Sequence, residues 1–92
     1  MKRYAVVRLS VDRSLVSEDA VDIYRPIFKF PDTNGQAVSG KFLAELSDRI
    51  GCGENVRCAL EFSVKDDYVF PSIEFLIFEG RRKVGHGVLD HQ

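Results

Sequence analysis

Residues 56–64 constrain the fold of this chain most strongly, because apolar and polar side chains alternate along them. Apolar side chains occupy the even positions, while Arg57, Glu61 and Ser63 stand between them. A repeat of two residues is typical of a β-strand with one face on a core and the other in water. The segment therefore predicts a half-buried strand.

Other segments of the chain have the composition of short strands. They are rich in β-branched and aromatic residues and are bounded by Gly, Pro, Asp or Asn. Asn34-Gly35 tolerates the positive φ angles of a tight turn. We expect strands at residues 4–11, 27–30, 73–78 and 83–89, and a sixth within residues 36–44.

Residues 42–50 leave an alternative open. Phe42, Leu43, Leu46 and Ile50 approximate the spacing of one face of a helix. The segment is short, and glycines stand on both sides of it. A helical turn there is the alternative to an all-β interpretation.

Six short strands without repeats or linkers predict an all-β fold, a six-stranded closed antiparallel β-barrel formed by one domain over residues 1–92. Closing the sheet removes the exposed edges that a small β protein must otherwise protect. A chain of this length buries about 60% of its unfolded surface, which leaves room for one core and one surface site. The expected core residues are Phe28, Phe30, Val56, Leu60, Phe62, Phe75 and Ile77.

The charge balance and the hydropathy of the chain exclude several classes of protein. Thirteen Lys and Arg residues stand against fourteen Asp and Glu residues, so the formal net charge is -1. Contact with nucleic acid would therefore depend on a local patch and not on bulk charge. No apolar run approaches the roughly 20 residues of a membrane span, and Arg8 interrupts the apolar segment near the start. We expect a cytoplasmic protein without a membrane partner.

The two cysteines are too few for a disulfide framework and lack the spacing of a structural zinc site. Cys58 belongs to the apolar side of residues 56–64, so we expect it to pack in the core as a small hydrophobic residue. Cys52 stands between two glycines in a turn sequence, where we expect a partly exposed thiol.

The residues that could support catalysis do not form a complete motif. Residues 35–41 have the glycine and lysine spacing of a phosphate-binding loop, but Phe42 stands where a Ser or Thr must reach magnesium. His86 and His91 have no catalytic partner at motif spacing. We expect no enzymatic activity, no metal site, no cofactor and no bound nucleotide. An enzyme built around His86 with nearby acids is retained only as a third hypothesis.

Three motifs occur in an order and at a spacing that resemble a known family. They are Tyr-Arg-Pro-Ile-Phe-Lys-Phe at residues 24–30, Ile-Gly-Cys-Gly-Glu-Asn-Val at residues 50–56, and Glu-Gly followed by Val-Gly-His-Gly-Val within residues 79–88. Together they resemble the third, C-terminal domain of translation elongation factor Tu and its eukaryotic counterpart, over nearly the whole chain. The resemblance implies a β-barrel and a connection to the translation machinery.

In that family the domain contacts the T-stem of aminoacyl-tRNA, packs on the GTPase domain and is touched by the nucleotide-exchange factor. Residues 16–19 carry acid where the family has basic residues, and Arg81 stands where the family usually has a glycine. Adjacent cations at the final turn could meet phosphates. The RNA-binding residues that the resemblance implies, together with these cations, are Lys65, Glu79, Gly80, Arg81 and Arg82.

The strand expected at residues 73–79 presents a second candidate surface. Leu76 and Phe78 alternate with the core residues and should point outward from the barrel. Neighbouring apolar groups on an outer face suggest a contact surface, unless the N-terminal segment or residues 68–70 cover them. The candidate partner-binding residues are Glu74, Leu76, Phe78, Arg81 and Arg82.

We therefore expect a non-catalytic protein-interaction module. Its partner would be another protein or a second copy of the chain in a homodimer. The alternative is an RNA-binding module that retains part of the tRNA-facing surface of the elongation factor.

Overall fold

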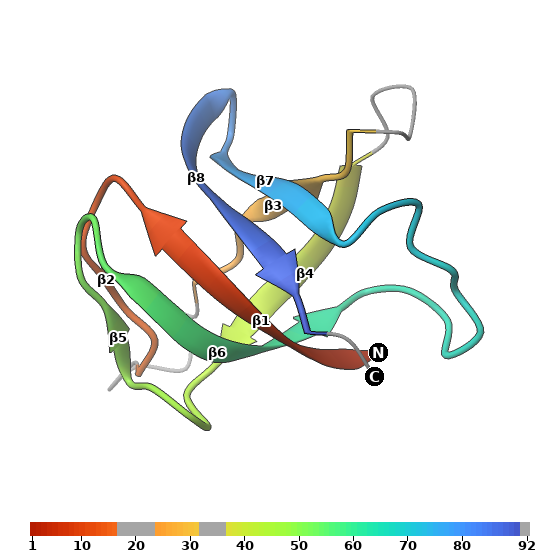
Figure 1. The fold of residues 1–92 in the computed structure, drawn as a ribbon, viewed down its shortest axis with the longest axis horizontal. Helices are drawn as coiled ribbons and strands as arrows, with labels where there is room; N and C mark the ends of the chain where they lie inside the picture. Colours follow the sequence, from red (N-terminus) through yellow and green to blue (C-terminus); the bar gives the residue numbers. More distant parts are fainter. Residues whose placement is uncertain (17–23, 32–36, 91–92) are drawn as a thin grey trace.

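The alternating segments close into a barrel of six strands (Figure 1). The computed structural model describes residues 1–16, 24–31 and 37–90. A separate two-stranded sheet pairs β2 (Arg13–Ser14) with β5 (Arg49–Ile50). The barrel strands are β1 (Lys2–Leu9), β3 (Ile27–Lys29), β4 (Ala37–Leu43), β6 (Asn55–Phe62), β7 (Glu74–Glu79) and β8 (Arg82–Leu89).

The strands follow the order β1-β6-β4-β3-β7-β8 around the barrel, and β8 pairs with β1 to close it. Every pair is antiparallel. The predicted all-β, six-stranded closed barrel is therefore confirmed. The helical alternative for residues 42–50 is wrong, because β4 continues to Leu43 and a turn then leads into β5. No helix among the described residues is long and apolar enough to cross a membrane.

The core is filled by the inward side chains of all six barrel strands, with a group of phenylalanine rings at its centre. The ring of Phe28 lies 5.0 Å from that of Phe62 and 5.5 Å from that of Phe75, both edge to face. Cys58 is fully buried and Cys52 is exposed, as expected. The predicted core is confirmed except for Val56, which is half-buried at the start of β6.

The pairing of β7 with β8 is interrupted by one extra residue. Ile77 pairs with Gly85 but Phe78 pairs with Lys83, so Val84 has no residue opposite it. Such a β-bulge shifts the alternation of the strand by one position. Val84 and Gly85 consequently both face inward, and Lys83 is exposed together with Arg82.

Gly87 lets the aromatic core approach the backbone of β8. A methyl group at this position would lie 2.4 Å from the Phe75 ring and 2.9 Å from a methyl carbon of Val7. The absent side chain therefore provides the space that the Phe75 ring occupies.

Candidate functional site

The outer face of β7 carries the apolar pair that the sequence places there. Leu76 and Phe78 point away from the core but are half-buried. Phe78 pairs with Ile27 on β3, and the Lys29 ammonium lies 4.2 Å from the centre of the Phe78 ring. Neighbouring strands thus shield part of this face and leave part of it accessible.

The N-terminal segment and residues 68–70, which could cover Leu76 and Phe78, have contacts elsewhere in the structure. The Phe70 ring lies 5.1 Å from the ring of Phe30 and 5.0 Å from that of Phe62, so residues 68–70 pack against core rings. The amino group of Met1 donates a hydrogen bond of 2.8 Å to the carbonyl of Phe62 at the end of β6.

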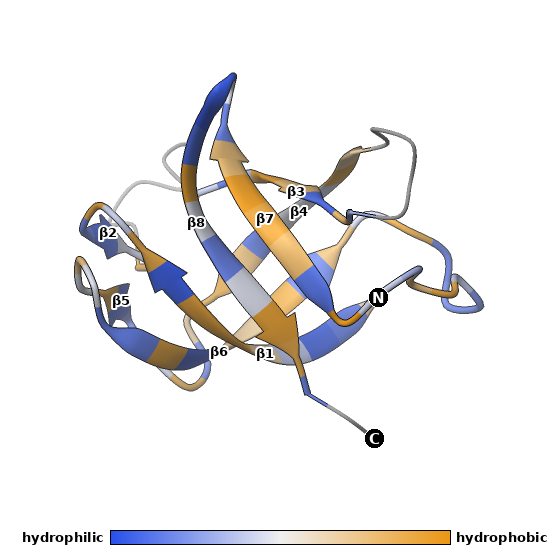
Figure 2. Ribbon diagram, turned by 45° about the horizontal axis from the view of Figure 1, so that its top comes forward, coloured by the Kyte–Doolittle hydropathy of each residue, from blue (hydrophilic) through white to orange (hydrophobic). Residues whose placement is uncertain are grey.

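A shallow hollow of about 240 Å³ opens between β7 and β8 on this outer face. Leu76 and Val88 form its apolar walls with Pro31, and Glu74 and His86 add polar groups. Figure 2 shows hydrophobic residues along most of β7 where the strand faces the viewer. Val88 continues the apolar surface to its partner Val6 on β1, and each of these two valines is 40% exposed.

The hairpin turn between β7 and β8 carries exposed cations. Gly80 has a φ of 62°, a left-handed conformation that glycine adopts without strain. Arg81 and Arg82 are exposed beside it, and within the described part of the chain neither side chain has a hydrogen bond or an ion pair, although Arg82 lies opposite Glu79 and its charge helps to lower the pKa of that carboxylate. Their side chains are therefore available to a ligand.

Lys65 does not belong to this cluster. It lies in the loop that leads from β6 into the start of β7, whereas Arg81 follows the end of β7 (Figure 1). The six residues of β7 span roughly 17–20 Å. The structure thus places Lys65 apart from the other candidate RNA-binding residues, Glu79, Gly80, Arg81 and Arg82.

Glu79 is held in an ion pair that sequence reasoning missed. Its carboxylate accepts hydrogen bonds from Nε and from a terminal nitrogen of Arg13, at 2.7 and 2.5 Å. These bonds lower the pKa of Glu79 below its usual value. Glu79 therefore stabilises the fold by fixing β2 beside the end of β7, and its charge is already neutralised.

Tyr24 lies next to this ion pair. The Arg13 guanidinium carbon is 5.8 Å from the centre of the Tyr24 ring, and that ring stacks on Phe42 at 5.4 Å. Burial raises the pKa of Tyr24 well above its usual value, and the nearby Glu79 carboxylate raises it further. The Tyr24 hydroxyl is buried without a hydrogen-bond partner among the described residues.

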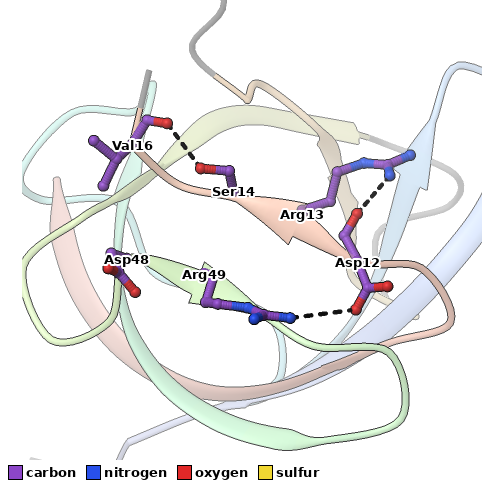
Figure 3. Close-up of a pocket in the computed structure, with 6 residues that line it drawn as sticks. All are labelled: Asp12, Arg13, Ser14, Val16, Asp48 and Arg49. Carbon is purple, nitrogen blue, oxygen red and sulfur yellow. Dashed lines mark hydrogen bonds and ion pairs between the residues drawn. The ribbon is translucent and has the colours of Figure 1, made fainter. Parts of the chain in front are cut away.

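A second hollow, of about 330 Å³, lies at the small sheet formed by β2 and β5 (Figure 3). The Asp12 carboxylate accepts a hydrogen bond of 2.8 Å from the Cys52 amide and lies 3.8 Å from the Arg49 guanidinium. The hydroxyl of Ser14 donates to the carbonyl of Val16 at 2.8 Å. With Asp48 and Arg13 also on its wall, this hollow contains both signs of charge.

A third hollow, of about 430 Å³, is basic. It lies where β1 ends beside the first half of β8 and the turn at residues 51–54. Arg8, Lys83 and His86 line it, with Ser10 and the exposed Cys52. None of its lining residues is acidic.

The described residues contain no group of three His, Cys, Asp or Glu side chains that could hold a metal ion. His86 is exposed on the outside of β8, whereas Cys58 is enclosed in the core, so these two side chains do not form a nucleophile pair. Of residues 35–41, the described part forms strand β4 and not a loop before a helix; residues 35–36 and His91 lie outside the described residues.

The geometry thus brings together Glu74, Leu76 and Phe78 on one face, with Arg81 and Arg82 at its end, and leaves Lys65 apart. Scans of protein-family models and of curated proteins give no match to this chain.

Proposed function

We propose that this chain is a non-catalytic protein-interaction module whose partner docks on the outer face of β7 and β8. The observation that carries the proposal is the hollow between Leu76 and Val88. A closed barrel has no free strand edge for backbone pairing, so a partner must use an outer face or an end of the barrel. A partner side chain seated in an apolar hollow is the usual energetic centre of a specific interface.

Polar groups surround the apolar part of this face. Glu74 and His86 line the hollow itself, and Arg81 and Arg82 lie beyond Phe78 at the hairpin turn. An apolar centre with a polar rim of mixed charge is the common arrangement in protein–protein interfaces. The resemblance to the C-terminal domain of elongation factor Tu supports a binding role, because that domain acts through contacts with other macromolecules. Proteins of the translation apparatus are therefore the first partners to test.

The substitution Leu76→Glu tests this proposal. It introduces a charge at the wall of the hollow while leaving the inward side chains of β7 in place. We expect the variant to remain folded by circular dichroism but to lose self-association in light scattering, or to lose the proteins that cross-link to the wild type. Val69→Glu is the matched control, because Val69 is 84% exposed in the loop before β7.

A specific outcome would contradict the proposal. If the wild type is monomeric at millimolar concentration, and Leu76→Glu cross-links to the same proteins as the wild type, then this face is not an interface.

RNA binding is the second candidate function, and the exposed Arg81 and Arg82 favour it. Binding that depends on contacts between basic side chains and RNA phosphates weakens steeply as the salt concentration rises. Retention of the protein on immobilised tRNA should therefore be compared at low and moderate salt. Arg82→Ala should reduce retention at low salt. Lys65→Ala should have the same effect only if a single RNA spans the length of β7. Retention that neither substitution changes would exclude this surface.

A further inference from the structure

The basic hollow brings together cations that meet no acid. Some other cations of the barrel do meet acids: Lys2 contacts Glu45, and a terminal nitrogen of Arg57 lies 2.7 Å from the Asp90 carboxylate. Within the described part of the chain, Arg8 and Lys83 have no such partner. Two permanent charges thus border the same hollow without neutralisation.

The strand register brings these groups together. Arg8 lies directly opposite His86 on β8 and opposite Asn55 on β6, so no acid flanks it on either side. Residues that lie opposite each other on adjacent strands have Cβ atoms about 5 Å apart, so the Arg8 guanidinium and the His86 ring can contact the same ligand.

The β-bulge adds Lys83 to the set. Regular alternation from His86 would turn Lys83 inward, three positions earlier on the strand. The unpaired Val84 shifts the alternation, and Lys83 becomes exposed on the rim of the hollow. A local irregularity of the sheet thus completes a group of three nitrogen-bearing side chains.

The other two hollows do not share this property. Asp12 and Asp48 accompany Arg13 and Arg49 in the hollow of Figure 3. Glu74 lines the apolar hollow on β7 and β8. Of these three hollows, the basic hollow is therefore the one whose lining carries positive charge without an acid.

We propose that this hollow binds the terminal phosphate of a small ligand. The Arg8 guanidinium can donate two parallel hydrogen bonds to phosphate oxygens, Lys83 supplies a compact positive charge, and His86 supplies a ring N–H. The volume of about 430 Å³ is within the range of small-molecule sites. Three such groups on the lining of one hollow favour a doubly charged phosphomonoester over the singly charged phosphodiester of a nucleic acid.

The backbone amides of the adjacent turn are already used. The Cys52 amide donates to Asp12, the Gly53 amide to the Leu9 carbonyl at 2.8 Å, and the Glu54 amide to the Gly51 carbonyl at 3.1 Å. The anion is therefore bound by side chains, and single substitutions should weaken it.

A titration of the ¹⁵N-labelled chain with inorganic phosphate tests the proposal, with chloride at matched ionic strength as the reference. We expect saturable shifts of the Arg8 side-chain signal and of the backbone amides of Gly53 and Lys83. Arg8→Gln should weaken binding about tenfold, as expected for one lost charged hydrogen bond. Lys83→Gln should weaken it in the same direction. Lys65→Gln at the other end of β7 should leave it unchanged.

Reactivity of Cys52 gives a second measurement that needs no variant. Cys52 lines the hollow and is exposed, whereas Cys58 is buried and should not react with an alkylating reagent in the folded chain. Bound phosphate should slow alkylation of Cys52 by iodoacetamide, and chloride at the same ionic strength should not.

Two results would overturn the assignment. One is a set of shifts that do not saturate or that are equal in Arg8→Gln and the wild type. The other is a short single-stranded RNA that shifts the same residues at lower concentration than phosphate does, because the hollow would then serve a polynucleotide.

Discussion

Arg13 and Glu79 are 66 residues apart in the sequence and form a two-point ion pair, with N–O distances of 2.7 and 2.5 Å. Arg13 belongs to the small sheet and Glu79 is the last residue of β7, so the pair fastens the small sheet to the barrel. Both side chains are partly shielded from water, with 34% and 26% of their surface exposed. This shielding makes the pair stronger than a fully exposed one.

Glu79→Gln should therefore lower stability by about 1 kcal/mol at neutral pH. The pKa of folded Glu79 lies below its unfolded value of about 4.3, so the contribution is fully present above that pH. It is lost as the pH falls through the lowered folded-state pKa. Urea denaturation at pH 7 and at pH 3 measures both effects, and the variant and the wild type should converge in acid. Glu74→Gln on the same strand is the control, and an equal loss there would contradict the assignment.

Phe62→Ala should cost about 3–5 kcal/mol, a large part of the stability of so small a domain. The Phe62 side chain is 1% exposed and its ring meets those of Phe28, Phe70 and Phe75. The midpoint of chemical denaturation measures the loss. Val69→Ala is the exposed control and should change stability by less than about 0.5 kcal/mol. An unchanged midpoint for Phe62→Ala would remove this ring from the core.

Gly87→Ala should destabilise the barrel by about 1–3 kcal/mol, because the added methyl group overlaps the Phe75 ring. The same methyl group would also lie 2.9 Å from a methyl carbon of Val7. Thermal unfolding of Gly87→Ala, alone and combined with Phe75→Leu, separates overlap from other causes. The smaller side chain should recover part of the loss in the double variant. If the two effects simply add, steric overlap is not the cause.

Phe78→Glu should leave the chain folded, because the Lys29 ammonium above the ring can pair with the new carboxylate. If the outer face of β7 is the interface, the variant should form smaller assemblies than the wild type in light scattering. Phe78→Leu keeps the apolar character and should assemble as the wild type does. Equal assembly of Phe78→Glu and the wild type would place the interface elsewhere.

The two thiols should differ sharply in reactivity. Burial raises the pKa of Cys58 to about 12, so its thiolate is almost absent at pH 8. Titration of the native chain with a thiol reagent at pH 8 should therefore count one reactive thiol, Cys52. A second should appear only in denaturant. Two reactive thiols in the native chain would indicate that β6 opens readily.

The long strands could be predicted from sequence because their pattern is local. Alternation along residues 56–62 fixes which side of β6 is buried, and the same rule places Phe75 and Ile77 inward. The strand closure at β8 was predictable from its glycines and apolar residues, whereas the bulge at Val84 was not. One extra residue changes the alternation without leaving a distinct residue pattern.

The site was only partly predictable, because its decisive contacts join distant segments. β2 and β5 contain two residues each, too few to show any periodicity. The sequence around Arg13 therefore does not indicate that Arg13 pairs with Glu79. The sequence around Arg8 likewise does not indicate that Arg8 lies opposite His86. Leu76 and Phe78 were correctly placed on the outer face. Their partial burial depends on neighbours from β3 and β8 that the sequence does not identify.

The bulge in β8 also separates two parts of the molecule that could change independently. Before it, the hairpin tip with Arg81 and Arg82 presents consecutive side chains to solvent; after it, Gly85 and Gly87 face the core in strict alternation. Loss of Val84 would remove the bulge and leave Lys83 opposite Phe78 and Gly85 opposite Ile77, in regular alternation. Loss of one residue after Gly85 would instead exchange the inner and outer positions of the residues on one side of the deletion, so the length of β8 is fixed beyond the bulge.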